Sequence, residues 1–279
     1  MTMKATVTEL NLYPIKGCRG FGVRSATLPA TGLEVNGIGD REWVVVDAGG
    51  RFLSQREHPR MALIETRFVG AALRVKAPGM LALEVPFASE GDIVEVQVWN
   101  DTIPAVTQGE IADAWFSNFL GVPARLVRFD LEARRLANPR YTGATEAPYK
   151  FADAFPLLVT GQASLAELNA RLARISEAPI TMARFRPNIV LAGLAGFEED
   201  YIESLRRDDL VIRPVKPCAR CTVPGVDPLT GESSTTVPDL LASFRGTADG
   251  VMFGVNAIVA AGAGATLAVG DEFEVELRF

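Results

Sequence analysis

The feature that most constrains this fold is the strict alternation of apolar and polar residues in two stretches, 93–99 and 272–279. Successive side chains of a β-strand point to opposite faces, so a period of two predicts a strand with one buried and one solvated face. Valines alternate with glutamate and glutamine in the first stretch, and phenylalanine, valine and leucine alternate with charged residues in the second. The second stretch is expected to be structural and not part of a site.

Turn signals divide the first half of the chain into further short strands. The apolar run 43–46 leads into an Asp-Ala-Gly-Gly turn, and Asn36-Gly37 marks a tight turn upstream of it; both patterns are typical of β-hairpins. Residues 1–10 are predicted to form a first strand. The uncharged segment 250–270 is about as long as a membrane-spanning helix, but its glycines favour two buried strands joined by a turn, so no membrane partner is expected.

Few segments carry helix signals. A serine and a glutamate three residues apart, at 164–167, have the pattern of a capping box, and leucines at helical spacing follow until Pro179. A shorter helix is predicted over 111–120, with Gly121 at its end. The acidic stretch 198–200 is expected to be solvated surface.

These signals together predict a mixed α/β, β-rich protein of two barrel-like units with a few covering helices. With 279 residues, 48% of them hydrophobic, the chain is long and apolar enough for two modest domains. Residues 131–150 are polar and contain Asn-Pro, Thr-Gly and Ala-Pro turn dipeptides. We therefore predict a first domain over 1–130 and a second over 131–279.

Charge and composition exclude several classes of function. The net charge of −6 is opposite to the basic surface of a nucleic-acid-binding protein, so no nucleic-acid partner is expected. His58 is the single histidine and lies in a turn before a proline, which excludes His-rich metal sites and paired-His mechanisms. Three cysteines are too few for a disulfide framework, and residues 1–10 do not have the pattern of a secretory signal, so a cytoplasmic location is expected.

The sharpest local motif is Cys218-Ala-Arg-Cys221, and four interpretations compete for it. A structural zinc site would need Cys18 and His58 as its remaining ligands, which is a contrived set. A redox dithiol normally lies at a helix N-terminus, whereas the prolines and glycine after Cys221 start no regular helix. The third interpretation is a single thiolate ligand for a soft metal, with Arg220 favouring deprotonation. The fourth is two ordinary thiols on a loop.

A second group of candidate residues is cationic. Lys16, Arg41 and Arg186, the last with Asn188 two residues later, each lie beside a predicted strand in a turn rich in Gly or Pro. In such turns a charge can face a cleft. An acidic protein that binds a phosphate-bearing ligand needs local cations of this kind, because Arg binds phosphate bidentately and Lys acts as a point charge. Taken singly, each is also explained as an ordinary surface charge.

The motifs follow one another in an order that is similar to that of a known family. They are Leu12-Tyr-Pro-Ile-Lys16, Gly39-Asp-Arg41, Ala163-Ser-Leu-Ala-Glu-Leu-Asn169, Phe185-Arg-Pro-Asn-Ile-Val190, Cys218-Ala-Arg-Cys221, Val226-Asp-Pro-Leu-Thr-Gly231 and Gly270-Asp271. With these motifs the chain resembles a MOSC-domain protein with an N-terminal MOSC β-barrel domain. Within that family it is similar to the mitochondrial amidoxime-reducing components and to bacterial proteins that detoxify hydroxylaminopurines. The resemblance covers nearly the whole chain.

The resemblance implies a molybdenum cofactor, a pterin dithiolene that carries a phosphate and a molybdenum atom. By its position in the Arg-Cys motif, Cys221 would be the thiolate ligand of the metal and the catalytic residue, and Cys218 a supporting thiol. The residues implied in cofactor binding are Lys16, Arg41, Asp153, Phe155, Arg186, Asn188 and Arg220. The family is also associated with pyridoxal phosphate binding.

The implied site also includes the stretch 151–155 and a glycine beside Lys16. Asp153 and Phe155 belong to the stretch 151–155, which is expected to line the cofactor through backbone groups. Relatives usually have Lys-Ser-Cys where this chain has Lys16-Gly17-Cys18. A hydroxyl donor is therefore missing, and Gly17 would let the backbone approach the ligand more closely.

The function implied by the resemblance is reduction of N-hydroxylated small molecules by oxygen-atom removal at molybdenum. No cysteine follows Cys221, so the chain cannot hold the Cys-ligated iron–sulfur cluster that some bacterial relatives append. A separate electron donor of the ferredoxin or cytochrome type is therefore expected. The alternatives are a carrier of sulfur as a persulfide on Cys221, and a non-enzymatic binding module in which Cys218 and Cys221 are inert.

Overall fold

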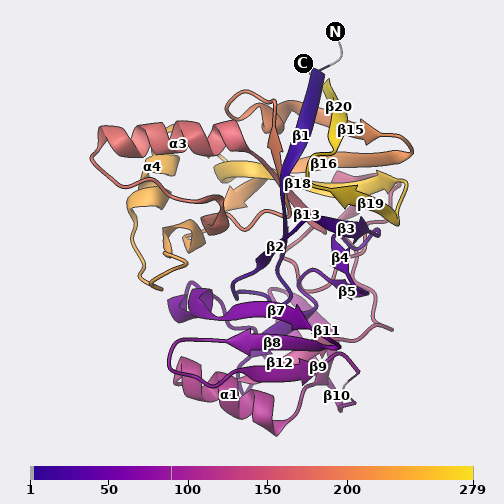
Figure 1. The fold of residues 1–279 in the computed structure, drawn as a ribbon, viewed down its shortest axis with the longest axis vertical. Coiled ribbons are helices and arrows are strands. Elements are labelled where there is room, and N and C mark those ends of the chain that lie inside the picture. Colours follow the sequence, from indigo (N-terminus) through magenta and orange to yellow (C-terminus); the bar gives the residue numbers. More distant parts are fainter. Residues whose placement is uncertain (1–2, 89, 279) are drawn as a thin grey trace.

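The computed structural model describes residues 3–88 and 90–278, which form two β-rich units, one above the other in Figure 1. The upper unit in that view is a closed barrel built mainly from the second half of the chain. The lower unit consists of two small sheets and a helix between residues 43 and 129. This arrangement confirms the predicted β-rich fold of two units with few helices.

Seven strands form the barrel, in the order β13-β14-β1-β20-β15-β16-β18, and β18 pairs back to β13. Only the β13–β14 pair is parallel among these neighbours. Closure satisfies the backbone hydrogen bonds that an open sheet leaves at its edges. The strands are β1 (Met3–Leu12), β13 (Leu157–Gly161), β14 (Ile189–Ala192), β15 (Ile202–Arg207), β16 (Leu210–Arg220), β18 (Gly250–Ala261) and β20 (Glu272–Leu277).

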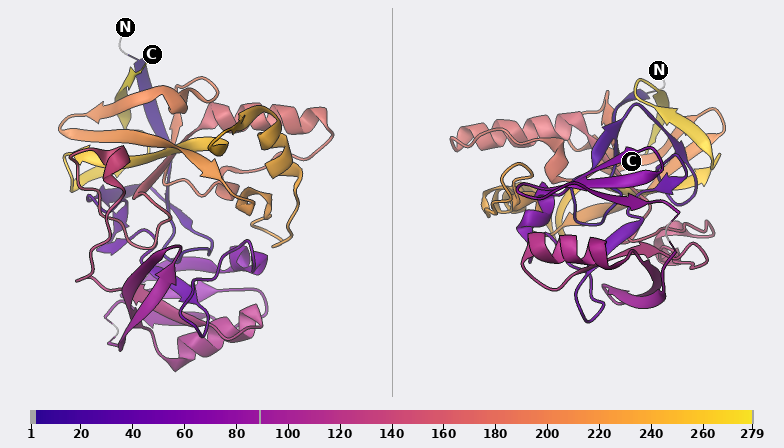
Figure 2. Two further views of the ribbon diagram at one scale, coloured as in Figure 1. Left: turned by 180° about the vertical axis from the view of Figure 1, so that it is seen from behind. Right: turned by 60° about the horizontal axis from the view of Figure 1, so that its bottom comes forward.

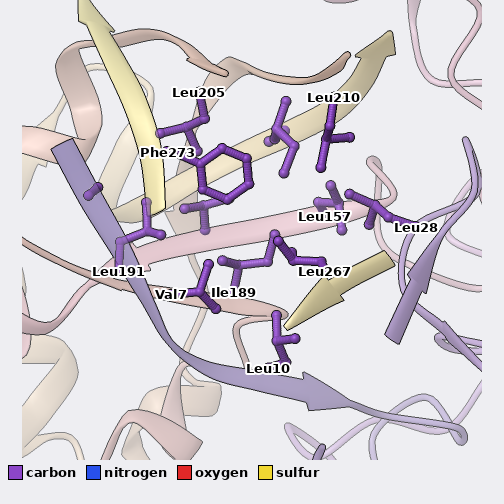
Figure 3. Close-up of a cluster of buried hydrophobic side chains, with 14 of the residues drawn as sticks. Val7, Leu10, Leu28, Leu157, Ile189, Leu191, Leu205, Leu210, Leu267 and Phe273 are labelled. Carbon is purple, nitrogen blue, oxygen red and sulfur yellow. The ribbon is translucent and has the colours of Figure 1, made fainter. Parts of the chain in front are cut away.

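Aliphatic side chains and one phenylalanine ring fill the barrel interior (Figure 3). Leu10, Leu157, Ile189, Leu205 and Phe273 come from five different strands, and each is at most 1% exposed. Burial of such a side chain contributes about 2 kcal/mol. The packed interior therefore gives a rigid frame for the residues that flank its strands.

The barrel takes one strand from the start of the chain. β1 pairs antiparallel with β14 on one side and with β20 on the other, with Met3 opposite Val275. The first and last described strands thus lie side by side at the top of Figure 1. The division of the sequence into domains at residue 130 stays a prediction, and in space β1 joins the barrel of the second half.

The lower unit packs two sheets and one helix around an aromatic core. The four-stranded sheet has the order β10-β11-β12-β6, and the three-stranded sheet the order β7-β8-β9. Trp43 of β6 and Phe116 of α1 are fully buried in the apolar cluster that the sheets and the helix share. The elements are β6 (Trp43–Val46), β7 (Glu65–Val69), β8 (Ala72–Lys76), β9 (Leu83–Pro86), β10 (Ile93–Val98), β11 (Asp101–Thr107), β12 (Arg125–Phe129) and α1 (Glu110–Leu120).

Short strands connect the two units. β2 (Phe21–Val23) pairs with β1, and β3 (Ser25–Leu28), β4 (Glu34–Val35) and β5 (Ile38–Gly39) form a small sheet with β19 (Ala265–Ala268). The chain therefore leaves the barrel after β1, runs along it, and then enters the lower unit (Figures 1 and 2). It returns to the barrel through residues 130–156.

Helices lie mainly on one side of the barrel (Figures 1 and 2). α3 (Gln162–Arg174) and α4 (Thr236–Arg245) share an apolar cluster that includes Leu168, Leu241 and Phe253. The remaining short elements are α2 (Pro139–Thr142), β17 (Gly246–Thr247) and the 3-10 helices η1 (Pro59–Leu63), η2 (Met182–Arg184), η3 (Glu198–Tyr201) and η4 (Val223–Gly225).

Several sequence predictions are confirmed. The alternating stretches form β10 and β20, although Phe279 lies outside the described residues. The glycine-rich segment forms β18 and β19 around a turn at Gly262 and Gly264, and no helix in the described residues is long and apolar enough to cross a membrane. Asn36 and Gly37 join β4 to β5 with φ values of +54° and +76°, as a primed turn requires.

The capping-box prediction was wrong. α3 begins at Gln162 with Gly161 as its N-cap, and Ser164 lies inside its first turn, where it is fully buried. Ser164 Oγ donates to Glu199 Oε2 at 2.6 Å, and Gly161 N donates to Glu199 Oε1 at 3.1 Å. A carboxylate distant in sequence therefore caps this helix in place of the local glutamate.

The expectation that residues 198–200 are solvated surface was also wrong. Glu199 is 0% exposed, and Asp200 forms a partly buried ion pair with Arg245. Both carboxyl groups have partners inside the protein, a helix terminus for Glu199 and the Arg245 guanidinium for Asp200, which a sequence pattern of three acidic residues does not reveal.

Candidate functional site

A cavity of about 290 Å³ lies where the two units meet. Segments around residues 16–17 and 52–56 line one part of it, the linker 152–155 another, and barrel segments 185–188 and 216–221 the rest. All eight residues that the family resemblance implies line this one cavity: Lys16, Arg41, Asp153, Phe155, Arg186, Asn188, Arg220 and Cys221. The fold thus brings together residues from almost the whole length of the chain.

Arg41 and Arg186 form the centre of a cationic wall. Both have left-handed backbone, with φ values of +48° and +57°, which costs a residue other than glycine about 1 kcal/mol. Contacts hold them there: each guanidinium lies 4.4 Å from the centre of the Tyr13 ring. Arg41 Nη2 donates to Arg186 O at 3.0 Å, and Arg186 Nη1 donates to Cys18 O at 2.6 Å.

The proximity of these two arginines is electrostatically unfavourable without an anion. Burial, followed by repulsion from Arg41, lowers the pKa of Arg186 to about 10. Arg41 also pairs with Asp40, whose carboxylate is 2% exposed and accepts a hydrogen bond from Tyr13 N at 2.8 Å. One buried carboxylate compensates part of the charge, and a bound phosphate would compensate the rest.

Asn188 joins this wall to the barrel. It precedes β14 and is 1% exposed. Its Oδ1 accepts hydrogen bonds from Leu158 N at 3.1 Å and from Arg41 Nη1 at 3.2 Å, and its Nδ2 donates to Asn11 O at 3.3 Å. The amide therefore ties the Arg41 side chain to β1 and β13.

Lys16 follows the end of β1 by four residues and is 7% exposed. Its Nζ donates to Phe151 O at 2.9 Å and to Asp153 Oδ1 at 2.5 Å, and it lies 5.3 Å from the centre of the Phe52 ring. Burial lowers the pKa of Lys16, and the carboxylate of Asp153 opposes that shift. Lys16 thus anchors the linker segment 151–153 against the lower unit.

Asp153 differs from its expected role, since its side chain and not only its backbone reaches the cavity. The side chain is 72% exposed. The surrounding protein partly desolvates the carboxyl, which raises its pKa, but the ammonium of Lys16 and the indole N–H of Trp99 lower it more, so the pKa lies far below its ordinary value. Asp153 is therefore a fixed negative charge beside the cations.

The cysteine motif occupies the end of β16 and not a free loop. Cys218 and Arg220 belong to the strand, whose register against β18 shifts at Pro217 and Ala219, and Cys221 is the first residue beyond it. The 3-10 helix η4 follows, so no α-helix dipole acts on either thiol. Cys221 is exposed, Cys218 is half-buried and Cys18 is buried.

Arg220 does not contact the thiol that the sequence assigns to it. Its Nη1 donates to Cys218 Sγ at 3.1 Å, and its Nη2 donates to Phe185 O at 2.7 Å. We expected Arg220 to lie beside Cys221 and to favour its deprotonation, but its hydrogen bond goes to Cys218. Alternate residues of a strand share a face, and Cys218 lies two positions before Arg220.

Several residues that line the cavity were not predicted from the sequence. Three of them, Phe52, Arg56 and Trp99, contact one another. Arg56 lies 4.5 Å from the centre of the Trp99 ring, and the Phe52 and Trp99 rings are 5.1 Å apart. They come from the lower unit, and no family motif marked them. The one available signal was the position of Trp99 at the end of an alternating strand. Lys216 and Asn256 were also missed.

The lining residues fit a phosphate-bearing cofactor with a thiolate-bound metal. Six cationic side chains line the cavity, against the one carboxylate of Asp153: Lys16, Arg41, Arg56, Arg186, Lys216 and Arg220. The described residues contain no cluster of three or more His, Cys, Asp or Glu side chains that could hold a metal ion. A metal at Cys221 would therefore need its other ligands from the cofactor, as a dithiolene would supply them.

Fold and site together define a protein of two β units with an anion-binding cleft between them and an exposed thiol in the cleft. Residues 4–123 match the MOSC N-terminal beta barrel domain, and residues 146–274 match the MOSC domain. The chain belongs to the MOSC-domain family, as the resemblance implied.

Relatives in that family match over most of the chain. The mitochondrial amidoxime reducing component 2 of Bos taurus is 33% identical over 246 residues, which cover 86% of this chain and 72% of that protein. The corresponding human protein shows the same identity and coverage. The mitochondrial amidoxime-reducing component 1 of Xenopus laevis is 31% identical, over 86% of this chain and 71% of the relative.

Proposed function

We propose that this protein is a molybdenum-cofactor-dependent reductase of N-hydroxylated small molecules: amidoximes, hydroxylamines and N-hydroxylated bases. The observation that carries the proposal is the exposed thiol of Cys221 at the end of β16, in a cavity lined by six cations. The names of the relatives support the substrate class. Membership of the MOSC family supports the cofactor.

The cofactor, when bound, would supply the two-electron chemistry that removes the oxygen atom from the substrate. The overall reaction uses two electrons and two protons, converts an N–OH group to N–H and releases water. Cys221 would be the protein ligand of the metal. Arg41 and Arg186 would bind the phosphate, with Asn188 holding Arg41 in place through the 3.2 Å hydrogen bond.

The remaining residues would orient the cofactor and limit the access of water. Lys16 would fix the linker at Phe151 and Asp153, and the buried ring of Phe155 would form an apolar wall. Arg220 would hold Cys218 beside the metal ligand. We propose that the two electrons come from a separate ferredoxin- or cytochrome-type donor and that the protein acts in the cytoplasm. Turnover with NAD(P)H alone would contradict the separate donor.

The test is the molybdenum and pterin content of protein purified from a host that makes the cofactor, compared among the parent, C221A and C218A. Near-stoichiometric molybdenum in the parent, altered or lost in C221A and retained in C218A, is the expected result. Reduction of an amidoxime with a chemical electron donor should follow the same order. Protein without metal and pterin in all three forms would overturn the proposal.

Exposure of Cys221 also favours a second candidate function, the transfer of sulfur as a persulfide in cofactor sulfuration. This carrier would hold labile sulfane sulfur that C221A abolishes and C218A does not. Sulfane sulfur without pterin would favour the carrier, and neither sulfur nor pterin would leave an inert binding module.

A further inference from the structure

Trp99 stands out among the cavity residues by its backbone. It forms a two-residue turn with Asn100 between Val98 of β10 and Asp101 of β11, which pair with each other. Its φ is +58°, a value that glycine adopts readily at the first position of such a hairpin turn and a bulky residue does not. A tryptophan here costs about 1 kcal/mol of backbone strain, and strain of this kind is retained where the side chain has a task.

Three contacts hold the Trp99 side chain at the cavity. Its Nε1 donates to Asp153 Oδ1 at 2.9 Å. Its ring lies 5.1 Å from the ring of Phe52, and the guanidinium of Arg56 lies 4.5 Å from its centre. The lower unit and the linker therefore fix the indole together, in one orientation.

The indole is nevertheless available to a ligand. Of the three tryptophans, Trp43 is 0% exposed and Trp115 7%, whereas Trp99 is 41% exposed. Trp99, Phe52 and Arg56 line both the main cavity and a second cavity that adjoins it. The three side chains thus form a wall with an aromatic surface that the two cavities share.

The surroundings of Trp99 combine an aromatic surface with a hydrogen-bond acceptor, which suits a planar molecule that carries donor groups. The carboxylate of Asp153 is in contact with the indole and offers the acceptor, whereas Arg41 and Arg186 attract a phosphate elsewhere in the cavity. Lys16 and Trp99 both donate to Oδ1 of Asp153, so Oδ2 can accept from the N–OH or NH₂ group of an amidoxime. An indole face already binds one planar N–C–N group, the guanidinium of Arg56.

We propose that Trp99, with Phe52 and Asp153, is the substrate platform of the site and makes it selective for N-hydroxylated compounds that carry an aromatic ring. The ring would stack on the indole, and the N-hydroxylated group would donate to Asp153. This inference rests on the proposed reductase function. It goes beyond that function because it names the part of the substrate that the protein selects.

Benzamidoxime and acetamidoxime test the platform, because they share the reacting group and differ in a phenyl ring against a methyl group. Replacing Trp99 by glycine removes the indole and relieves the φ of +58°, so W99G is expected to fold. An aromatic contact of this size predicts a rise of about fivefold in KM for benzamidoxime, with kcat and the KM for acetamidoxime changed less than about twofold. W99F keeps a ring and should retain most of the preference.

The matched control is N100G, which places a glycine at the neighbouring position of the same turn. Asn100 lines the second cavity but not the main one, so this change should leave both KM values unchanged. Equal changes for the two amidoximes in W99G would overturn the platform. Loss of pterin from W99G, with pterin kept in N100G, would also overturn it, because the indole would then contact the cofactor. Failure of the parent to reduce either amidoxime contradicts the reductase function itself.

Tryptophan fluorescence gives a readout that does not depend on turnover. Since Trp99 is the most exposed of the three tryptophans, benzamidoxime should quench the emission of the parent and of N100G in a saturable manner. The same titration of W99F should show little quenching, and acetamidoxime should quench neither. Saturable quenching of W99F equal to that of the parent would contradict stacking on Trp99, whether or not the protein reduces amidoximes.

Discussion

Arg41 Nη1 donates a hydrogen bond to Asn188 Oδ1 at 3.2 Å, across 147 residues of sequence. The contact joins the segment that enters the lower unit to the residue that precedes β14 of the barrel. Arg41 has a left-handed backbone, and Asn188 acts with Tyr13, Asp40 and the carbonyl of Arg186 to fix the direction of its side chain.

Replacing Asn188 by alanine should destabilise the protein and displace Arg41. The change leaves the buried Leu158 N–H without its acceptor and removes one acceptor of Arg41. An unsatisfied buried donor costs about 1–3 kcal/mol, so the free energy of unfolding in urea should fall by about that amount. N118A, which truncates an exposed asparagine on α1, is the control and should change stability by less than about 0.5 kcal/mol. Equal stability of the two variants would contradict this role of Asn188.

The exchange of Arg41 for lysine should weaken phosphate binding although the charge is kept. A lysine ammonium cannot reproduce both the Nη1 contact to Asn188 and the Nη2 contact to Arg186 O. We expect about tenfold weaker retention of pterin in R41K, measured as pterin released during dialysis. R24K changes an exposed arginine and should retain pterin as the parent does. Unchanged retention in R41K would show that only the charge at this position matters.

Sequence patterns predicted the elements whose stability depends on their own residues. The alternation in 93–98 and the Asn36-Gly37 turn are complete local signals, and both structures formed as expected. The capping box at Ser164 failed because its competitor, Glu199, lies 35 residues away. A local pattern cannot indicate a cap that tertiary structure supplies.

The cavity residues also divide into those that a local sequence pattern indicates and those that it does not. Lys16, Arg41, Arg186 and Cys221 were candidates from their own turns and from the cysteine spacing, and the order of the family motifs then implied that they share one site. Trp99 was missed because a tryptophan is not a turn signal and because its partner Asp153 comes from the linker, 54 residues later. The segment around Trp99 therefore carries no pattern for this contact, because the partner of Trp99 comes from another part of the chain.

The three thiols should react with iodoacetamide in the order Cys221, Cys218, Cys18. Cys221 is exposed and Cys218 half-buried. Burial raises the pKa of Cys18 to about 12, against a smaller opposing effect of Arg186, so almost no thiolate forms at pH 8. Peptide mass spectrometry after timed labelling measures the order. Labelling of Cys18 before unfolding would mean that the contact between the Cys18 carbonyl and Arg186 opens in solution.

The buried carboxyl of Glu199 should make stability depend on pH in the acidic to neutral range. Burial raises its pKa in the folded protein, and the hydrogen bonds from Ser164 and Gly161 only partly oppose that shift. Above the ordinary glutamate pKa of about 4.3, the unfolded chain loses this proton, whereas the folded protein holds it to a higher pH. By linkage, proton binding at Glu199 stabilises the folded protein fully below about pH 4.3, and this stabilisation is lost as the pH rises through the folded-state pKa.

Urea unfolding at several pH values, compared between the parent and E199Q, measures this contribution. E199Q stays neutral and can still accept from Gly161 N, so its stability should fall less than that of the parent between pH 4 and pH 7. E198Q, at the neighbouring residue, whose side chain is partly exposed, is the matched control and should follow the parent. Parallel pH profiles for the parent and E199Q would show that Glu199 has the same proton affinity in the folded and unfolded states, in spite of its complete burial.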